Sequence, residues 1–289
     1  MLFLLTVPIQ MHVHFLDPYR PRTSPVHALD GRVKFILTVA FILTASLAPV
    51  AAWPVYILLF ALILSVEILS GLGIGYVLKR ALLALPFVLA AFPLIFTNGR
   101  TMLFSFSIGS WILTAHAEGL ARFVSLALKS WLSVQAAIIM AASTPFPELL
   151  QAMRAVGVPR LLVSMFGMMW RYTFVLVDEA LRLMRARAAR SGSWAGQPGK
   201  TSSSHRRLRV REGGSIRWRA RVTGGMAGNL LLRAFERSDH IYVAMLSRGY
   251  DGEVRLLPLA PLAGTTRLAL VAGLVMLGAL LSLGILFWG

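Results

Sequence analysis

The sequence contains no cysteine, which excludes disulfides, thiolate metal sites and cysteine nucleophiles. Charged residues are also scarce, at 14% of the 289 residues, well below the roughly 25% usual in soluble domains. Acidic residues are the rarest of these: 12 stand against 29 Lys and Arg, which gives a formal net charge of +17. Because 57% of the residues are hydrophobic and the mean hydropathy is +0.70, the composition predicts that lipid surrounds much of the chain.

The motifs of nucleotide chemistry are missing as well. No Gly-x-x-x-x-Gly-Lys-Ser/Thr pattern occurs, so the chain supplies no P-loop and any ATP hydrolysis must come from another polypeptide. Gly71-Leu72-Gly73-Ile74-Gly75 resembles a dinucleotide loop only superficially, because it follows an apolar run and leads into Lys79 and Arg80. No cluster of titratable residues stands at a membrane boundary. We therefore predict no catalytic residues and no enzymatic activity.

Histidine offers little for metal binding. His12, His14 and His27 fall in a polar N-terminal arm, but they define no coordination geometry. His116 and Glu118 are two residues apart, a spacing that does not place side chains on one helix face. We predict no metal site and interpret these histidines as solvated or structural.

Five apolar runs are long enough to cross a hydrocarbon core of roughly 30 Å, which needs about 20 helical residues. They are Val33–Trp53, Pro54–Gly71, Ala81–Thr97, Ala117–Ala142 and Leu268–Trp288. The sequence therefore predicts an all-α, polytopic helical membrane protein with about five transmembrane helices and further amphipathic helices. Between the third and fourth runs, Asn98–Thr114 is too irregular for a span, so we expect a re-entrant or interfacial loop there.

A few residues inside these runs constrain their packing. Pro86 and Pro93 predict kinks in the third run. Glu67, in the second, is compatible with an ion relay, a hydrogen bond to protein or an interfacial position. Three charged residues in the first half of the fourth run should face protein or the interface because charge is costly in lipid. These are Glu118, Arg122 and Lys129.

Basic residues predict the orientation. Residues 150–255 hold 19 Lys and Arg against 7 Asp and Glu, a net charge of +12, and no run there is long and apolar enough to cross. By the positive-inside tendency this segment, the N-terminal arm and the short turn at Lys79 and Arg80 are cytoplasmic. We therefore expect a multi-pass protein of the bacterial cytoplasmic membrane, with its N-terminus and its large basic segment in the cytoplasm.

The predicted organisation has four parts. They are a cytoplasmic arm (1–32), four transmembrane helices (33–142), a cytoplasmic and interfacial helical region (143–255) with a basic linker (191–225), and a C-terminal transmembrane helix (256–289). Within the third part, Arg160–Arg190 predicts a long helix that is apolar at first and basic later. Asn229–Arg248 predicts a second, one-sided helix that Gly249 closes as a C-cap.

These two helices end alike, with one arginine among small residues. Arg190 is followed by Ser191 and Gly192, and Arg248 stands between Ser247 and Gly249. Small side chains allow close approach of another backbone, and a guanidinium can bind a carboxylate bidentately. Such an end suits an acidic groove on a soluble partner. The alternative is an ordinary helix C-terminus, where arginine favours the dipole and glycine closes the helix.

Over nearly its whole length the chain resembles the transmembrane T component of energy-coupling factor (ECF) transporters, the CbiQ-like family associated with cobalt and nickel uptake. The residues that carry the resemblance are Leu29–Lys34, Gly157-Val158-Pro159, Arg171, Glu179, both arginine motifs, and Ala244–Tyr250 with Asp251-Gly252. In that family two crossed coupling helices each carry an Ala-Arg-Gly motif. Here the motifs depart from that pattern, as Ala-Arg-Ser at Arg190 and Ser-Arg-Gly at Arg248.

The resemblance implies partners for a chain that binds no solute or cofactor itself. ATP and Mg²⁺ would be bound by two ABC-type ATPase subunits, which dock on Arg190 and Arg248. A separate substrate-binding membrane subunit, a small accessory membrane subunit and the lipid bilayer would complete the assembly. A deformable methionine surface is expected to contact the substrate-binding subunit; the same residues also suit lipid or core packing. They are Met153, Met165, Met168 and Met169.

The mechanism implied is that nucleotide-driven motion of the ATPases moves Arg190 and Arg248 relative to each other, and the helices transmit it. This requires the two arginines to be exposed and not far apart. Cobalt is the favoured solute, with nickel or a vitamin as alternatives. A function of another class is a membrane-anchored binder of anionic lipid or nucleic acid, which would use the arginine-rich stretch Arg206–Arg221; for the transporter subunit, no nucleic acid is expected.

Overall fold

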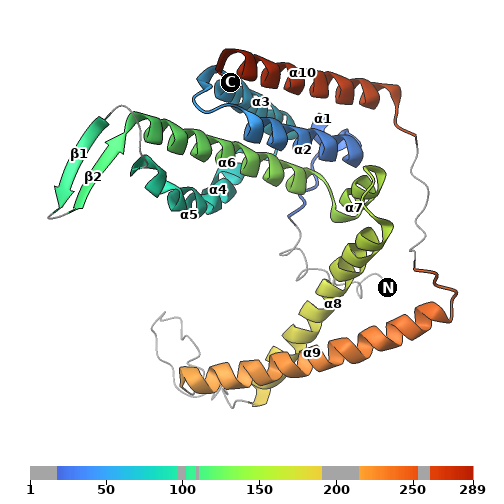
Figure 1. Cartoon of the computed structure of the whole chain (residues 1–289). Helices are drawn as coiled ribbons and strands as arrows, with labels where there is room; N and C mark the ends of the chain where they lie inside the picture. Colours follow the sequence, from blue (N-terminus) through green and yellow to red (C-terminus); the bar gives the residue numbers. More distant parts are fainter. Residues whose placement is uncertain (1–17, 97–101, 109–110, 191–214, 253–260, 289) are drawn as a thin grey trace, which may run out of the picture. The chain divides into compact units, whose positions relative to one another are not determined.

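The computed structural model describes residues 18–96, 102–108, 111–190, 215–252 and 261–288 (Figure 1). The elements are α1 (Pro25–Ala28), α2 (Gly31–Leu47), α3 (Trp53–Ser70), α4 (Ile74–Ala81), the 3-10 turn η2 (Leu82–Ala84), α5 (Leu85–Ala90), the 3-10 turn η3 (Phe92–Phe96), β1 (Met102–Ile108), β2 (Trp111–His116), α6 (Ala117–Ser143), α7 (Phe146–Ala155), α8 (Arg160–Arg190), α9 (Ile216–Leu246) and α10 (Gly264–Trp288). The predicted helical membrane architecture is confirmed, with one small β-hairpin added to it.

The chain divides into two compact units. The first comprises the described parts of residues 1–159 and 257–289, and the second those of 160–256. The first unit therefore holds α1 to α7 together with α10, and the second consists of α8 and α9. Helix α7, which we assigned from the sequence to the region starting at 143, packs against α2 in the first unit.

The centre of the first unit is the contact of α6 with α2 and α3. The core is built from small and branched apolar side chains, among them Ala45, Leu59, Leu132 and Ala142, each at most 1% exposed. At one end Lys34 of α2 is buried and donates from Nζ to the carbonyl of Ser143 over 3.0 Å. These contacts set α6 antiparallel to α2.

The turn between α2 and α3 is held by side chains of both neighbouring helices. Lys129 of α6 donates from Nζ to the carbonyl oxygens of Ser46 (3.0 Å) and Ala48 (2.6 Å). The last carbonyls of a helix have no partner within it, and a lysine there also suits the helix dipole. The hydroxyl of Tyr56 donates to the carbonyl of Pro49 over 2.7 Å. The expectation that Lys129 faces protein is confirmed.

Helix α10 packs closely on α2 through a glycine. A methyl group placed on Gly273 would lie 2.6 Å from Cδ2 of Leu37, closer than carbon atoms approach. Farther along, Gly284 is similarly close to Pro49 and Val55, at 3.3 and 3.4 Å. Small residues allow helices in a membrane to approach and gain van der Waals contact. The last apolar run of the chain is therefore part of the same helical layer as α2.

Five helical segments in the described part are long and apolar enough to cross a membrane. They are Trp53–Ser70, Ile74–Phe96, Ala117–Ser143, Arg160–Arg187 and Gly264–Trp288. The number agrees with the prediction, but one member differs. Helix α2 ends at Leu47, not Trp53, so its 17 residues extend only about 26 Å. Conversely, α8 qualifies, so the prediction that residues 143–255 contain no such run was wrong.

The third span also differs from its prediction. It begins at Ile74, so Lys79 and Arg80 lie in the last turn of α4 and not in a loop between spans. The sequence Gly71-Leu72-Gly73 makes the turn instead, with both glycines at positive φ (65° and 87°). The predicted interruptions are present, since α5 starts around Pro86 and η3 contains Pro93.

Two loop predictions were wrong. Residues 102–108 and 111–116 pair as an antiparallel hairpin, where we expected an irregular loop. Its sequence signal was the alternation of Phe and Ser in Phe104–Ser107 and the Gly109-Ser110 pair between the strands. The basic linker is shorter than predicted, because α9 already begins at Ile216, where the Oγ of Ser215 accepts the N–H of Trp218 as an N-cap. The remainder, 191–214, lies outside the described residues.

Candidate functional site

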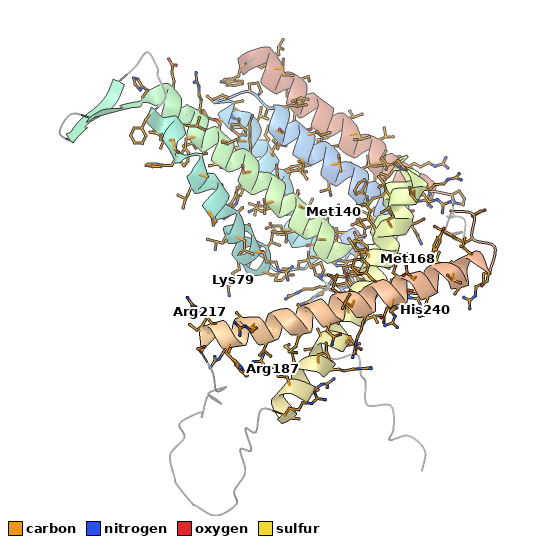
Figure 2. The ribbon with its side chains drawn as sticks, turned by 60° about the horizontal axis from the view of Figure 1, so that its bottom comes forward. Lys79, Met140, Met168, Arg187, Arg217 and His240 are labelled. Atoms are coloured by element: carbon orange, nitrogen blue, oxygen red, sulfur yellow. The ribbon has the colours of Figure 1, made fainter. Side chains whose placement is uncertain are left out.

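The two long helices of the second unit, α8 and α9, cross each other in opposite directions (Figures 1 and 2). Near the end of α8, the guanidinium of Arg187 lies 5.7 Å from the ring centroid of Trp218, at the start of α9. Near the start of α8, Leu161 lines the same groove as Tyr250, which follows α9. The carboxyl end of each helix therefore lies towards the amino end of the other.

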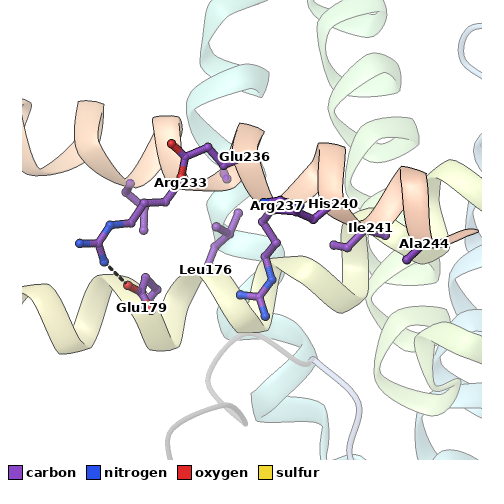
Figure 3. A pocket seen from close by; sticks show the side chains of 10 residues that line it. Leu176, Glu179, Arg233, Glu236, Arg237, His240, Ile241 and Ala244 are labelled. Carbon is purple, nitrogen blue, oxygen red and sulfur yellow. Dashed lines mark hydrogen bonds and ion pairs between the residues drawn. The ribbon is translucent and has the colours of Figure 1, made fainter.

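An ion pair joins the helices at their crossing. Nη1 of Arg233 on α9 donates to Oε1 of Glu179 on α8 over 2.7 Å, as Figure 3 shows. Leu176 lies between the helices beside the pair, in a cavity of about 470 Å³. The side chains are 53% and 29% exposed, so the pair contributes little to stability, on the order of 0.5 kcal/mol. Its geometry nevertheless sets which turns of α8 and α9 meet.

A larger groove of about 700 Å³ follows the two helices from the crossing towards the start of α8. Its lining is mostly apolar and flexible, with three methionines and three tyrosines. They are Met165, Met168, Met245, Tyr172, Tyr242 and Tyr250. Methionine side chains adapt to irregular partners because they are unbranched and polarisable.

Of the four methionines predicted to contact another subunit, the structure brings two together in this groove. Met165 and Met168 line it, and Met169 is exposed on α8 close by in sequence. Met153 is partly buried on α7, in the other unit. The sequence reasoning missed Met245, whose place on α9 opposite α8 could not be known before the helices were paired.

The end of α9 is closed as the sequence predicted. Gly249 has a φ of 78°, its N–H donates to the carbonyl of Leu246 (2.9 Å), and the N–H of Tyr250 donates to that of Met245 (3.0 Å). This pair of bonds is the Schellman motif, which lets a helix stop within one residue. Arg248 is exposed immediately before this turn. Its guanidinium therefore projects from a fixed helix end.

Arg190 is the last residue of α8 and is also exposed; Ser191 and Gly192 lie outside the described residues. Along their own helices, Arg190 is about 16 Å and Arg248 about 22 Å from the crossing ion pair, and the two lie on opposite sides of it. Both arginines are exposed, as the coupling mechanism requires, but they are not close to each other. The expectation that the two arginines lie not far apart is therefore wrong, because antiparallel helices carry their carboxyl ends apart.

Among the described residues, no group of three or more His, Asp or Glu could hold a metal ion. His27 is structural, since Nδ1 lies 2.7 Å from Oγ of Ser24 and Nε2 lies 3.0 Å from the carbonyl oxygen of Arg20. His116 is buried at the start of α6. His12 and His14 fall outside the described residues.

Glu67 is 2% exposed on α3, and its Oε1 has no hydrogen-bond partner in the described part of the chain. Glu118 and Arg122 approach each other at 4.0 Å as an i, i+4 pair and are about half exposed. Glu67, Glu118 and Arg122 all belong to the first unit, so they are not part of the crossed helices α8 and α9.

Comparison with known proteins decides the family. The family described as "CbiQ: Cobalt transport protein" matches residues 22–257, a range that includes both arginine motifs and both crossed helices. The chain belongs to the CbiQ family. Its resemblance to the T components of ECF transporters is thereby confirmed.

The similarity to relatives of this CbiQ-family chain extends over most of its length. It is 26% identical to the energy-coupling factor transporter transmembrane protein EcfT of Thermosediminibacter oceani, with 92% of this chain and 97% of the relative covered. The EcfT of Lactococcus lactis subsp. cremoris is also 26% identical, over 81% and 83%. The cobalt transport protein CbiQ of Rhodobacter capsulatus is 26% identical over 78% and 82%. These relatives are membrane subunits of transporters.

Proposed function

We propose that this CbiQ-family chain is the coupling subunit of an ATP-driven ECF importer, with one ABC-type ATPase subunit docked at each end of the α8–α9 pair. The observation that supports this most directly is the placement of two exposed arginines, Arg190 and Arg248, at opposite ends of helices joined at their crossing. Each guanidinium offers five donors to a carboxylate-lined groove. ATP and Mg²⁺ belong to the ATPase partners.

Force transfer follows from the ion pair at the crossing. When nucleotide closes two ATPase subunits, the ends that hold Arg190 and Arg248 are displaced. Because Glu179 and Arg233 hold the helices in one register, displacement at the ends turns one helix against the other around this point. The groove lined by Met165 and Met168 changes shape with that rotation. In this proposal the groove receives the substrate-binding membrane subunit, and a small accessory membrane subunit completes the assembly.

Co-purification tests the docking. The full chain, expressed with its ATPase subunits, should lose most of them in the Arg190→Glu, Arg248→Glu double variant, and each single variant should retain one. Arg182→Glu is the matched control, since it reverses an exposed arginine on α8 away from the helix end. Full retention of both ATPases by the double variant, with normal folding by circular dichroism, would reject this function.

We further propose cobalt as the solute, on the description of the family and of the Rhodobacter capsulatus relative. Uptake of radiolabelled Co²⁺ into vesicles that contain the whole assembly should exceed that of Ni²⁺ or a labelled vitamin. Because the solute would be bound by another subunit, variants of this chain should change the rate for every solute equally. A variant here that alters the preference between Co²⁺ and Ni²⁺ contradicts the assignment of solute choice to the partner.

A further inference from the structure

Two arginines from distant parts of the chain lie against one tyrosine ring in the first unit. The guanidinium carbon of Arg20 lies 3.7 Å from the ring centroid of Tyr76, and that of Arg80 lies 4.7 Å from the same centroid. Tyr76 and Arg80 are one turn apart on α4. Arg20 precedes α1 and is fixed by its backbone N–H, which donates to the carbonyl of Ala142 over 2.9 Å. The fold therefore gathers two cations around one aromatic group.

Neither charge is neutralised within the described ranges of the chain. No carboxylate there forms an ion pair with Arg20 or Arg80, and no acceptor there is hydrogen-bonded to either guanidinium. Both side chains are exposed, and Lys79 adds a third exposed cation next to Arg80 (Figure 2). A guanidinium over an aromatic face keeps its in-plane N–H donors available. Two like charges held against one ring repel each other unless an anion offsets them.

The surroundings indicate a lipid as the source of that anion. On α4, Val77 and Ala81 are fully buried, and the helix packs against α6. A second stripe is apolar but exposed: Ile74, Leu78 and Leu82 follow one another at four-residue intervals, with 43–47% of each accessible. The helix is also the first part of the candidate span Ile74–Phe96. A soluble anion would need no such apolar stripe, whereas an acyl chain does.

We propose that Arg20, Arg80 and Tyr76 bind the phosphate of an anionic phospholipid, whose acyl chains lie along Ile74, Leu78 and Leu82. Basic residues at the membrane surface attract anionic headgroups, and tyrosine rings are favoured at this level of the bilayer. The two guanidinium groups engage the phosphate oxygens, while the ring holds them at a fixed spacing. The bound lipid would secure the segment before α1 against α4. This site is separate from the crossed helices and does not depend on their function.

The amount of anionic lipid that the purified chain retains tests the proposed site. The full chain is purified into nanodiscs of phosphatidylcholine with a minor fraction of phosphatidylglycerol, and native mass spectrometry after detergent release counts the phosphatidylglycerol retained. Each of Arg20→Gln and Arg80→Gln should weaken retention about fivefold, and the double variant more than tenfold. Tyr76→Leu should weaken it as much as one arginine, because both guanidinium groups lose their support.

Matched controls separate a site from general surface charge. Arg22→Gln removes an exposed cation two residues from Arg20, and Lys79→Gln removes one next to Arg80; each should change retention less than twofold. Equal losses in the controls would overturn the proposal, since they would indicate diffuse attraction only. Millimolar inorganic phosphate should not displace the lipid. Complete displacement, or retention unchanged in the folded double variant, would also overturn it.

Discussion

Arg233 on α9 donates a 2.7 Å hydrogen bond to Glu179 on α8, across 54 residues of sequence. This bond lies where the two helices cross, and Leu176 packs beside it. Both members lie within residues 22–257, the range that matches the CbiQ family. In the proposed mechanism they act as the pivot of the two-helix unit, and their removal should affect transport more than folding.

Removal and then exchange of the charges of Glu179 and Arg233 tests whether this ion pair is the pivot. Glu179→Gln should lower ATP-driven uptake several-fold in proteoliposomes while ATPase binding persists, because the arginine ends are intact but the register is loosened. Unfolding free energy should fall by about 0.5 kcal/mol, the value of a half-exposed pair. The double exchange Glu179→Arg, Arg233→Glu should restore part of the uptake. Glu236→Gln, an exposed carboxylate one turn from Arg233, is the control, and an equal loss there would argue against a pivot.

Replacement of Lys129 should destabilise the turn between α2 and α3. Lys129→Met leaves the carbonyls of Ser46 and Ala48 without their donor, and a hydrogen bond from a charged group contributes about 1.5–3 kcal/mol. Thermal unfolding in detergent, followed by circular dichroism, measures the change. Lys79→Met, an exposed lysine, should leave the midpoint unchanged. A midpoint for Lys129→Met equal to that of the parent would show that the capping bonds do not matter.

Enlargement of Gly273 should separate α10 from α2. Gly273→Leu drives a side chain into Leu37, and overpacking of this kind costs about 1–3 kcal/mol. The second variant Leu37→Ala should recover much of this loss by making room. Gly278→Leu is a close control on the same helix, because nothing lies within 4 Å of its added Cβ. The unfolding free energy in detergent is compared for the parent, Gly273→Leu, the double variant with Leu37→Ala, and Gly278→Leu. If Leu37→Ala does not restore stability to Gly273→Leu, the close packing of Gly273 on Leu37 is contradicted.

A side chain at Gly249 should weaken ATPase binding at the Arg248 end only. Gly249→Ala forces a residue with a Cβ into φ 78°, at a cost of about 1 kcal/mol. The Schellman turn loosens, and Arg248 loses its fixed direction. We expect weaker ATPase binding at this end and unchanged binding at Arg190, measured by titration of labelled ATPase subunits. Gly228→Ala, in the interior of α9, should leave both unchanged; loss at both ends in Gly249→Ala would indicate general unfolding.

Local patterns in the sequence predicted what depends on neighbouring residues. The Gly249 turn, the breaks at Pro86 and Pro93, and the inward position of Lys129 were all correct, because capping, ring sterics and the cost of charge in lipid act within a few residues. The hairpin at 102–116 was missed although its alternation was present, because the irregular stretch Asn98–Thr114 was interpreted as a loop. The early start of α9 was missed because Gly224 and Gly225 indicated a linker.

Composition and motifs by themselves indicated a helical membrane protein that resembles the CbiQ family, that has no P-loop, and in which Arg190 and Arg248 end two long helices. Only the tertiary structure decided that these helices are antiparallel and hold their arginines apart, and that Arg20 and Arg80 share the ring of Tyr76. The reason is physical: hydropathy and helix signals are summed over adjacent residues, whereas the partner of Glu179 or Arg20 is selected by packing of segments distant in sequence.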